Sequence, residues 1–203
     1  AGEASFNRIL RIFGHEAIDF PDRPKVAIFG AGLIGVRLAK AWLDQNGTVT
    51  IVEKNLNKAN ELAGSDIGNR SGIEIIHGDH LDKDLLSEIE IGSHDIAISA
   101  LDDDHASIAA ALLASDMGVE RTGLIMYDAD LVSVVRRMGI TFSVDRKRVA
   151  IDTILSRIHS ELPGPYAVLS SVPDVIGICL TITSKVKFAG KTLVDAGLPE
   201  WCK

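Results

Sequence analysis

A glycine-rich hexapeptide has the residue types and the spacing that bind a diphosphate. It reads Gly30-Ala31-Gly32-Leu33-Ile34-Gly35 and matches the pattern G-x-G-x-x-G. In such a turn the first glycine permits a tight bend, the second lets the backbone approach a pyrophosphate, and the third lets a helix pack close to a sheet. Free N–H groups and the helix dipole then favour an anion. Alone, the pattern is weak, because glycine-rich turns are common.

An acidic residue follows at the distance that a dinucleotide site requires. Glu53 comes 18 residues after Gly35, and the typical spacing is about 20 residues. A carboxylate there accepts hydrogen bonds from the adenosine ribose and repels a 2′-phosphate, which favours NAD(H) over NADP(H). The neighbouring Lys54 softens this preference. The alternative is that Glu53 is only a polar residue at a strand end. We favour the binding role because the strand, the glycines and the acid follow one another in the order and at the spacing of the motif.

Polar residues also come at the end of the third predicted strand. Asp79 and His80 lie there, beside the adenine pocket of a doubly wound sheet. Asp79 could hydrogen-bond the base, or it could mark the start of a helix over 81–86, and the sequence favours neither role. We expect His80 to be exposed rather than to bind a ligand.

Three adjacent acids follow the fourth predicted strand, at the sheet edge where ligands bind. They are Asp102, Asp103 and Asp104, and they lack the alternating pattern of a calcium loop. Asp104 or a neighbour is a good N-cap for the next helix. Capping is therefore the favoured role, and we expect Leu101 and Asp102 to lie close to a bound cofactor.

The elements that must position these residues alternate between strand and helix. Short Val/Ile-rich runs indicate strands at 25–29, 48–52, 73–76, 95–100, 122–126 and 141–144. The segments between them indicate helices from the glycine turn to about Gln45 and over 58–63, 82–89, 104–117 and 131–138. This order predicts an α/β fold, with a Rossmann-like, doubly wound, parallel six-stranded sheet and helices on both faces.

The regular alternation ends near residue 145, and we expect four parts. Residues 1–23 form a short amphipathic helix over Phe6–Phe13 and a proline-containing linker, and residues 24–145 form the Rossmann domain. Residues 146–164 form an exit helix that a Pro-Gly-Pro sequence stops. Residues 165–203 are too few for an independent core, so we expect a truncated C-terminal α+β subdomain with a strand at 175–183.

The composition excludes several classes of partner. The net charge is −7 and the pI is about 5.3, whereas nucleic acids and anionic membranes require clustered Lys and Arg. The one dense basic run, Arg146-Lys147-Arg148, is equally typical of a solvated helix end, which we favour. Cys179 and Cys202 show no metal-ligand spacing and fit a reducing compartment. No apolar run reaches the roughly 18 residues that span a bilayer.

The chain lacks the parts of a dehydrogenase of this fold. Such an enzyme needs a substrate domain that holds a general acid or base against the nicotinamide, and the residues after Val144 are too few to form one. The histidines show no triad or metal-motif spacing with a Ser, Cys or Glu. We therefore interpret the chain as a regulator and not as a catalyst.

These segments together resemble the TrkA family of regulatory subunits of Trk-type bacterial potassium uptake systems, which are built from RCK (KTN) domains. The similar segments are Val26–Gly35, Glu53, His77-Gly78-Asp79, Asp95–Met117, Met138-Gly139-Ile140, Val144 and Phe188–Leu193. The last of these resembles the opening of the C-terminal RCK subdomain (TrkA-C). The leading segment resembles the stretch that joins the two halves of a tandem TrkA, so we expect the chain to be part of a longer protein.

The resemblance implies a ligand-gated clamp. Such domains form homo-oligomers, from dimers to rings, on a membrane potassium-transporting subunit at the cytoplasmic face of the cell membrane. Nucleotides in the Rossmann cleft change the shape of the ring; NAD(H) and ATP/ADP are both implied ligands. The site residues that the resemblance carries over are Gly30, Gly32, Leu33, Ile34, Glu53, Asp79, His80, Leu101 and Asp102.

Three residues depart from the family pattern. His105 and Ser107 stand where the family often has Glu and Asn, and Ile125 stands where many members have an Arg that reaches the phosphates. The missing charge favours a dinucleotide over a triphosphate. Three alternatives stay open: a fragment of an NAD-dependent oxidoreductase, an RCK module of another cation channel or antiporter, and a ring module whose cleft binds nothing.

Overall fold

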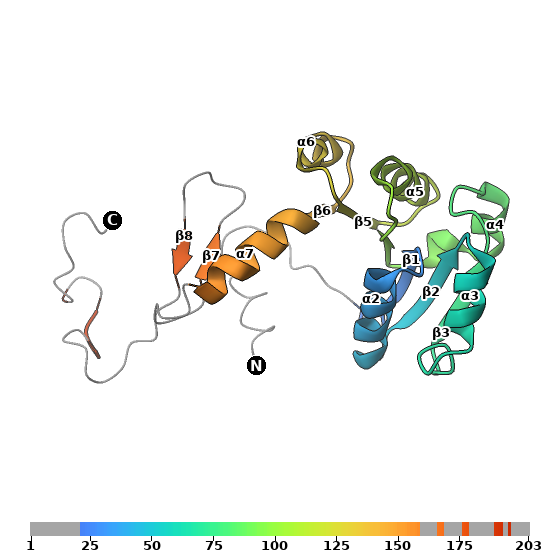
Figure 1. Ribbon diagram of the computed structural model, residues 1–203, viewed down its shortest axis with the longest axis horizontal. Helices are drawn as coiled ribbons and strands as arrows, with labels where there is room; N and C mark the ends of the chain where they lie inside the picture. The colour runs from blue at the N-terminus through green and yellow to red at the C-terminus, as the bar shows by residue number, and fades with distance from the viewer. Residues whose placement is uncertain (1–20, 159–165, 169–175, 179–188, 193–194, 196–203) are drawn as a thin grey trace. The chain divides into compact units, whose positions relative to one another are not determined.

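The computed structural model describes residues 21–158, 166–168, 176–178, 189–192 and 195 (Figure 1). The chain divides into two compact units, residues 1–146 and residues 147–203. Along the described part of the chain, none of the helices combines the length and the apolar character needed to cross a bilayer.

The first unit contains one six-stranded sheet. Its strands are β1 (Lys25–Phe29), β2 (Thr48–Glu53), β3 (Ile73–His77), β4 (Ile96–Ser99), β5 (Arg121–Met126) and β6 (Phe142–Asp145). They pair in the order β3-β2-β1-β4-β5-β6, and every pairing is parallel. The order reverses between β1 and β4, at the switch point where doubly wound sheets bind ligands. The predicted six-stranded, parallel, Rossmann-like sheet is therefore confirmed.

Helices connect the successive strands. They are α2 (Leu33–Asp44), α3 (Leu56–Ala63), α4 (Lys83–Glu88) with the 3-10 turn η1 (Ile91–Ser93), α5 (Asp104–Asp116) and α6 (Ala129–Arg137). Their bounds lie within a few residues of the predicted ones, because the spacing of apolar side chains indicates a helix more clearly than it indicates its ends.

The two faces of β1 show how the sheet is covered. Val26 and Ile28 pack in one cluster with α2 and α3, whereas Ala27 and Phe29 pack in a second cluster with α4 and α5. All four side chains are fully buried, which is why this central strand is continuously apolar rather than alternating. The carboxyl end of β1 is thereby held rigidly where the glycine turn begins.

The ends of β4 and β5 are fixed by small-residue packing. Ala110 and Ala114 of α5 are fully buried against the sheet, and a third cluster joins Leu124 of β5 to Val135 of α6. Alanine lets the backbone of α5 approach the strands closely. This packing holds β4 and β5 in place next to β1 in the sheet.

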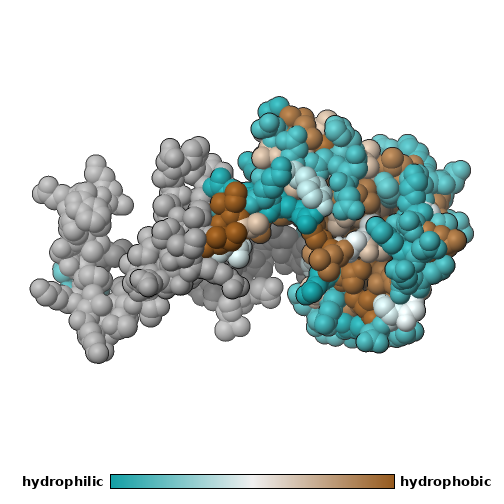
Figure 2. All heavy atoms as spheres, viewed as in Figure 1, coloured by the Kyte–Doolittle hydropathy of each residue, from teal (hydrophilic) through white to brown (hydrophobic). Residues whose placement is uncertain are grey.

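The second unit is described in part. Helix α7 (Arg146–Ile158) follows β6 directly, and β7 (Tyr166–Val168) pairs antiparallel with β8 (Ile176–Ile178). Strand β8 falls within the strand expected at 175–183, and β7 was not expected. Val149, Ile151 and Ile154 of α7 are exposed. In the first unit, the face seen in Figure 2 is largely hydrophilic, with smaller hydrophobic areas between the polar ones.

Some expectations fall on residues outside the described part. The predicted helix at Phe6–Phe13 lies wholly outside it, and Phe188–Leu193 lies partly outside it. The four domain limits and the truncated C-terminal subdomain stay predictions.

Candidate functional site

A pocket lies at the switch point of the sheet. Its lining comes from the start of α2, the turn after β4, the end of β5 and the start of α7, namely Gly32, Leu33, Ile34, Ala100, Leu101, Asp102, Ile125, Tyr127 and Arg146. Five of the predicted site residues, Gly32, Leu33, Ile34, Leu101 and Asp102, therefore share one pocket. All four lining segments are at the carboxyl edge of the sheet.

Steric contacts explain two of the three glycines in the turn. Gly30 has φ +102°, and a Cβ there would lie 3.1 Å from the carbonyl oxygen of Ala100 and from Cδ2 of Leu101. A Cβ at Gly35 would lie 2.0 Å from the carbonyl oxygen of Gly30. A side chain at Gly35 would therefore push the helix away from the turn, as the motif predicts.

The second glycine has a different environment. A Cβ at Gly32 would meet no described atom within 4 Å, so it would project into the open pocket. Gly32 is the N-cap of α2 and has an extended backbone, with φ −69° and ψ 175°, and no side chain caps the helix there. The space that a Cβ would fill is space available to a ligand.

The start of α2 differs from the starts of the four following helices. In α3, α4, α5 and α6 an Asn or Asp side chain accepts a hydrogen bond from the first turn; these caps are Asn55, Asp82, Asp103 and Asp128. In α2 the backbone ladder begins with the N–H of Val36, which donates to the carbonyl of Gly32 at 3.0 Å. The preceding N–H groups have no intrahelical partner, and Gly32, Leu33 and Ile34 at this helix start line the pocket.

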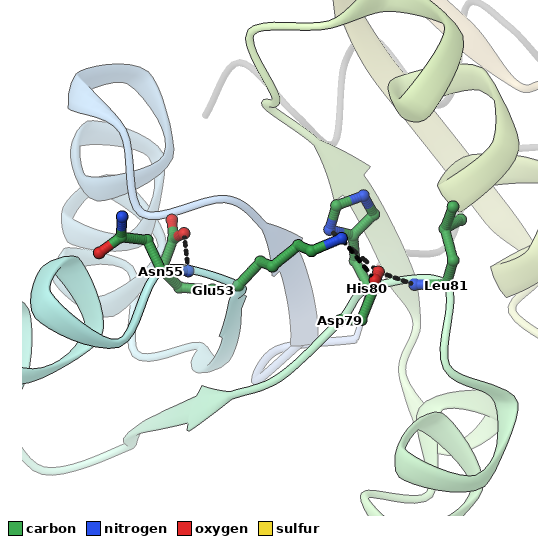
Figure 3. A network of polar contacts seen from close by, with 6 residues as sticks. Glu53, Asn55, Asp79, His80 and Leu81 are labelled. Atoms are coloured by element: carbon green, nitrogen blue, oxygen red, sulfur yellow. Dashed lines mark hydrogen bonds and ion pairs between the residues drawn. The ribbon is translucent and has the colours of Figure 1, made fainter.

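Glu53 connects the glycine turn to the end of β2. Glu53 is 8% exposed, and its carboxylate accepts hydrogen bonds from the N–H groups of Ala31 and Asn55, each at 2.7 Å. Figure 3 shows the side chain turned back toward the loop that follows β2. Each carboxylate oxygen has a second lone pair, so the group can hold the turn and still accept a ribose hydroxyl.

An ion pair joins the ends of β2 and β3. Nζ of Lys54 donates to Oδ2 of Asp79 at 2.7 Å, and Oδ1 of Asp79 accepts from the N–H of Leu81 at 3.0 Å (Figure 3). The hydrogen bond from Lys54 lowers the pKa of Asp79 below its usual range. The alternative in which Asp79 caps the next helix is wrong, because Asp82 caps α4. Both side chains of the pair are exposed at the edge of the sheet.

The expectation that His80 is exposed is wrong. His80 is 7% exposed, and its ring lies 6.4 Å from the ring of Phe29 between their centroids. Burial lowers its pKa, which favours the neutral imidazole. Its Nδ1 lies 4.0 Å from Oδ1 of Asp79 and makes no hydrogen bond to any described residue. His80 packs against the core because Phe29 completes β1 directly beneath it, a contact that the sequence pattern does not show.

The three acids after β4 have three different roles. Asp103 caps α5 by accepting from the N–H of Ala106 at 2.7 Å. Asp104 accepts from the N–H groups of Tyr127 and Asp128, at 3.0 Å and 2.8 Å. Asp102 lines the pocket and accepts from the hydroxyl of Tyr127 at 3.1 Å. The expected cap is thus Asp103, and Asp104 instead fixes the turn after β5.

Sequence reasoning missed Tyr127 and did not place Arg146 at the pocket. The Arg146 guanidinium lies over the Tyr127 ring, with Cζ 4.4 Å from the ring centroid, and it also donates to the Tyr127 hydroxyl. Burial, with the Asp102 hydrogen bond, raises the pKa of Tyr127. The basic run at 146–148 was the available signal. Arg146, the first residue of this run, lines the pocket beside Ile125 because α7 follows β6 directly.

The predicted residues thus form two groups on one sheet edge. Gly32, Leu33, Ile34, Leu101 and Asp102 line the pocket. Lys54, Asp79 and His80 follow β2 and β3, and Glu53 links the two groups through its bond to Ala31.

His105 and Ser107, which depart from the family pattern, are not among the described residues that line the pocket. His105 is exposed, and the hydroxyl of Ser107 is buried without a hydrogen-bond partner among the described residues. The described residues also contain no group of three or more His, Cys, Asp or Glu side chains that could hold a metal ion.

Two curated relatives are similar to nearly the whole chain. The Trk system potassium uptake protein TrkA of Azorhizobium caulinodans is 25% identical over 194 residues, which cover 94% of this chain and 40% of the relative. Its counterpart in Vibrio alginolyticus is 29% identical over 199 residues, which cover 97% of this chain and 42% of the relative. The chain therefore spans about two fifths of the length of these relatives.

Solved structures share the fold at lower identity. The TrkA-N domain of the inner membrane protein ybaL from Escherichia coli has a TM-score of 0.58 and 14% identity, covering 70% of this chain and 99% of that one. The GsuK channel bound to NAD has a TM-score of 0.54 and 20% identity, covering 71% and 26%. GsuK bound to ADP has a TM-score of 0.54 and 19% identity, covering 72% and 38%.

The sequence model of the TrkA-N domain matches residues 26–145. This match covers more than half of the chain and includes every strand of the six-stranded sheet except the first residue of β1. The chain belongs to the TrkA-N domain family.

Proposed function

We propose that this chain is a nucleotide-sensing regulatory module of a potassium uptake system, and that it binds NAD(H), or alternatively ATP or ADP, at the glycine turn. The observation that carries the proposal is the start of α2. Among the α-helices α2 to α6, α2 is the one whose start has no side-chain cap, and residues at this start line the pocket, whereas α3, α4, α5 and α6 are capped by Asn or Asp. Uncapped N–H groups with a helix dipole suit a phosphate.

The residues present fit a dinucleotide. The N–H groups of Gly32, Leu33 and Ile34 would hold the diphosphate, and Glu53 would accept a hydrogen bond from the adenosine ribose. Asp79 and His80 would lie at the adenine side, and Leu101 and Asp102 beside the second half of the ligand. The buried negative charge of Glu53 disfavours a 2′-phosphate, and Lys54 is engaged by Asp79, so NAD(H) is favoured over NADP(H).

Regulation by such a site requires no bond to be broken. A ligand shifts a conformational equilibrium by the difference between its affinities for the two conformations. The role of a regulator rather than an enzyme is supported by the names of the relatives, which are potassium uptake proteins. Solved structures of this fold include a channel bound to NAD and bound to ADP, which supports both classes of nucleotide as ligands.

The partners and the location follow from the same family membership. We infer a homo-oligomer, from a dimer to a ring, that acts on a membrane potassium-transporting subunit from the cytoplasmic face of the membrane. The likeness to a TrkA-N domain of an inner membrane protein supports a second candidate, a module of another transporter. Both candidates use the same nucleotide site.

Calorimetric titration of the purified chain with NADH, NADPH and ADP tests the proposal. We expect saturable binding of NADH and ADP at one site, with NADPH weaker than NADH by roughly tenfold or more, because Glu53 repels its 2′-phosphate. Absence of saturable binding of both NADH and ADP at millimolar concentration would falsify the sensor proposal.

A further inference from the structure

We propose that Arg146 is a phosphate-binding residue of this pocket and that it connects a bound phosphate to the start of helix α7. The inference rests on the proposed nucleotide site and adds to it a specific cation and a route for regulation. The probes are adenine nucleotides that differ in phosphate content, because a guanidinium binds phosphate through charge-assisted and often bidentate hydrogen bonds.

The position of Arg146 is the first step. Of the residues that line the pocket in the described part of the chain, it is the one that carries a positive charge, and Asp102 is the one that carries a negative charge. The pocket is also lined by Gly32, Leu33 and Ile34 at the uncapped start of α2. A phosphate in this space would have a helix N-terminus on one side and a guanidinium on another.

The contacts of Arg146 are the second step. Its guanidinium lies over the Tyr127 ring at 4.4 Å and donates to the Tyr127 hydroxyl, which is a neutral group. Among the described residues it forms no ion pair with a carboxylate. A guanidinium has five N–H donors, so this arrangement leaves donors and a full positive charge for an anion.

The third step is how hydrogen bonds hold Tyr127, on whose ring Arg146 lies. The Tyr127 backbone N–H donates to Asp104 at 3.0 Å, and its hydroxyl donates to Asp102 at 3.1 Å. These bonds tie the end of β5 to the turn after β4. The aromatic ring therefore presents Arg146 from a fixed surface, which reduces the conformational entropy that binding would otherwise cost.

The place of Arg146 in the chain is the last step. It is the first residue of α7 and the last residue of the first compact unit. A phosphate that binds both the glycine turn and Arg146 therefore restrains the point where the chain enters α7. A ligand without a phosphate would lack this restraint and would not shift the equilibrium through it.

The test compares the full chain with three variants, Arg146→Gln, Arg146→Lys and Arg148→Gln. Arg148→Gln is the matched control, because it removes the same charge two residues further along α7 from a side chain that pairs with Asp152 and does not line the pocket. Affinities for adenosine, AMP, ADP and NADH are measured by calorimetry. Hydrogen exchange over residues 147–150 is measured with and without ADP, and the melting temperature of each variant reports its folding.

We expect Arg146→Gln to weaken ADP and NADH by roughly tenfold or more, with adenosine unchanged, because a charge-assisted hydrogen bond to phosphate is lost. The affinity of Arg146→Lys for ADP and NADH should lie between that of the wild type and that of Arg146→Gln. Arg148→Gln should bind both nucleotides as the wild type does. ADP should slow exchange over 147–150 in the wild type and not in Arg146→Gln.

Two results would overturn this inference. If the wild type binds ADP and Arg146→Gln binds it equally well, Arg146 only packs on Tyr127, and the proposed nucleotide site stands without it. If the wild type binds none of the nucleotides, the nucleotide site itself fails and the role of Arg146 fails with it.

Discussion

The carboxylate of Glu53 accepts a hydrogen bond from the N–H of Ala31 at 2.7 Å, across 22 residues of chain. The acid that the sequence motif assigns to a ribose is therefore also a support of the glycine turn. Its second oxygen holds the N–H of Asn55 at 2.7 Å. Fold stability and ligand affinity should both depend on this one side chain.

Replacing Glu53 should therefore destabilise the fold. In Glu53→Gln one of the two oxygens becomes an NH₂ group, which cannot accept from the backbone, and a partly buried backbone N–H loses its acceptor. The expected loss in the free energy of unfolding is about 1–3 kcal/mol, measured by urea denaturation. Glu61→Gln, at an exposed position of α3, is the control and should change stability little. Equal stability of both variants would show that the buried bonds of Glu53 contribute nothing.

Adding a side chain should have opposite effects on the stability of the fold at Gly32 and at Gly35. Gly32→Asp places a preferred N-cap residue on a backbone that already has N-cap geometry, so stability should hold or rise by about a few tenths of a kcal/mol. The new carboxylate would occupy the helix N–H groups and repel phosphate, so NADH should no longer bind. Thermal melts with and without NADH measure both effects in one experiment.

Gly35→Ala should instead lose stability, because its Cβ would lie 2.0 Å from the carbonyl oxygen of Gly30. Overpacking of this kind costs about 1–3 kcal/mol. If Gly32→Asp still shows a nucleotide-dependent rise in melting temperature, the phosphates bind elsewhere than at this turn.

The neighbouring acids Asp103 and Asp104 should differ in their contribution to stability. Asp103→Ala removes one N-cap bond of α5, at a cost of about 1 kcal/mol. Asp104→Ala leaves the N–H groups of Tyr127 and Asp128 without their acceptor, so it should cost about 1–3 kcal/mol and be the larger of the two. Chemical denaturation of both variants measures the ranking, and the reverse ranking would contradict the role assigned to Asp104.

His94 should make stability depend on pH. It is 8% exposed; Nδ1 lies 3.1 Å from the carbonyl of Ile91 and Nε2 lies 3.0 Å from the hydroxyl of Thr50. The carbonyl can only accept, so Nδ1 carries the proton and Nε2 accepts from Thr50. Burial lowers the pKa of His94, despite the hydrogen bond to Ile91. Burial therefore favours the neutral ring in the folded state.

The sign of the effect follows from the lowered pKa. The unfolded histidine has a pKa of about 6.5, so its contribution to stability is complete above that pH and is lost as the pH falls toward the folded pKa. One such proton gives a slope of at most about 1.4 kcal/mol per pH unit. The free energy of unfolding should fall between pH 7.5 and pH 5.5, and less steeply in His94→Gln. His105→Gln, at an exposed position, should keep the wild-type slope; an unchanged slope in His94→Gln would contradict this prediction.

The fold was predictable because its signals are local and repeated. The run that became β1 is continuously apolar from Val26 to Phe29 because both faces of the strand are covered, and it is followed by a helix pattern. The glycine turn was also predictable, since Gly30 and Gly35 have steric requirements that no other residue satisfies.

The parts that the sequence could not show depend on packing between segments far apart in the chain. His80 is buried with its ring near that of Phe29, 51 residues earlier, and Asp104 accepts from residues 23 and 24 positions away. Arg146 lines the pocket only because α7 follows β6 without a loop. No pattern of spacing or composition carries these contacts.

The most direct test of the account is a titration of the ¹⁵N-labelled chain with NADH, followed by the shifts of its backbone amide signals. We expect the largest shifts at Gly32, Leu33 and Ile34, whose N–H groups would receive the diphosphate, with saturation at one common dissociation constant. Shifts that saturate elsewhere on the sheet while these three amides stay unmoved would contradict the claim that this turn is the nucleotide site.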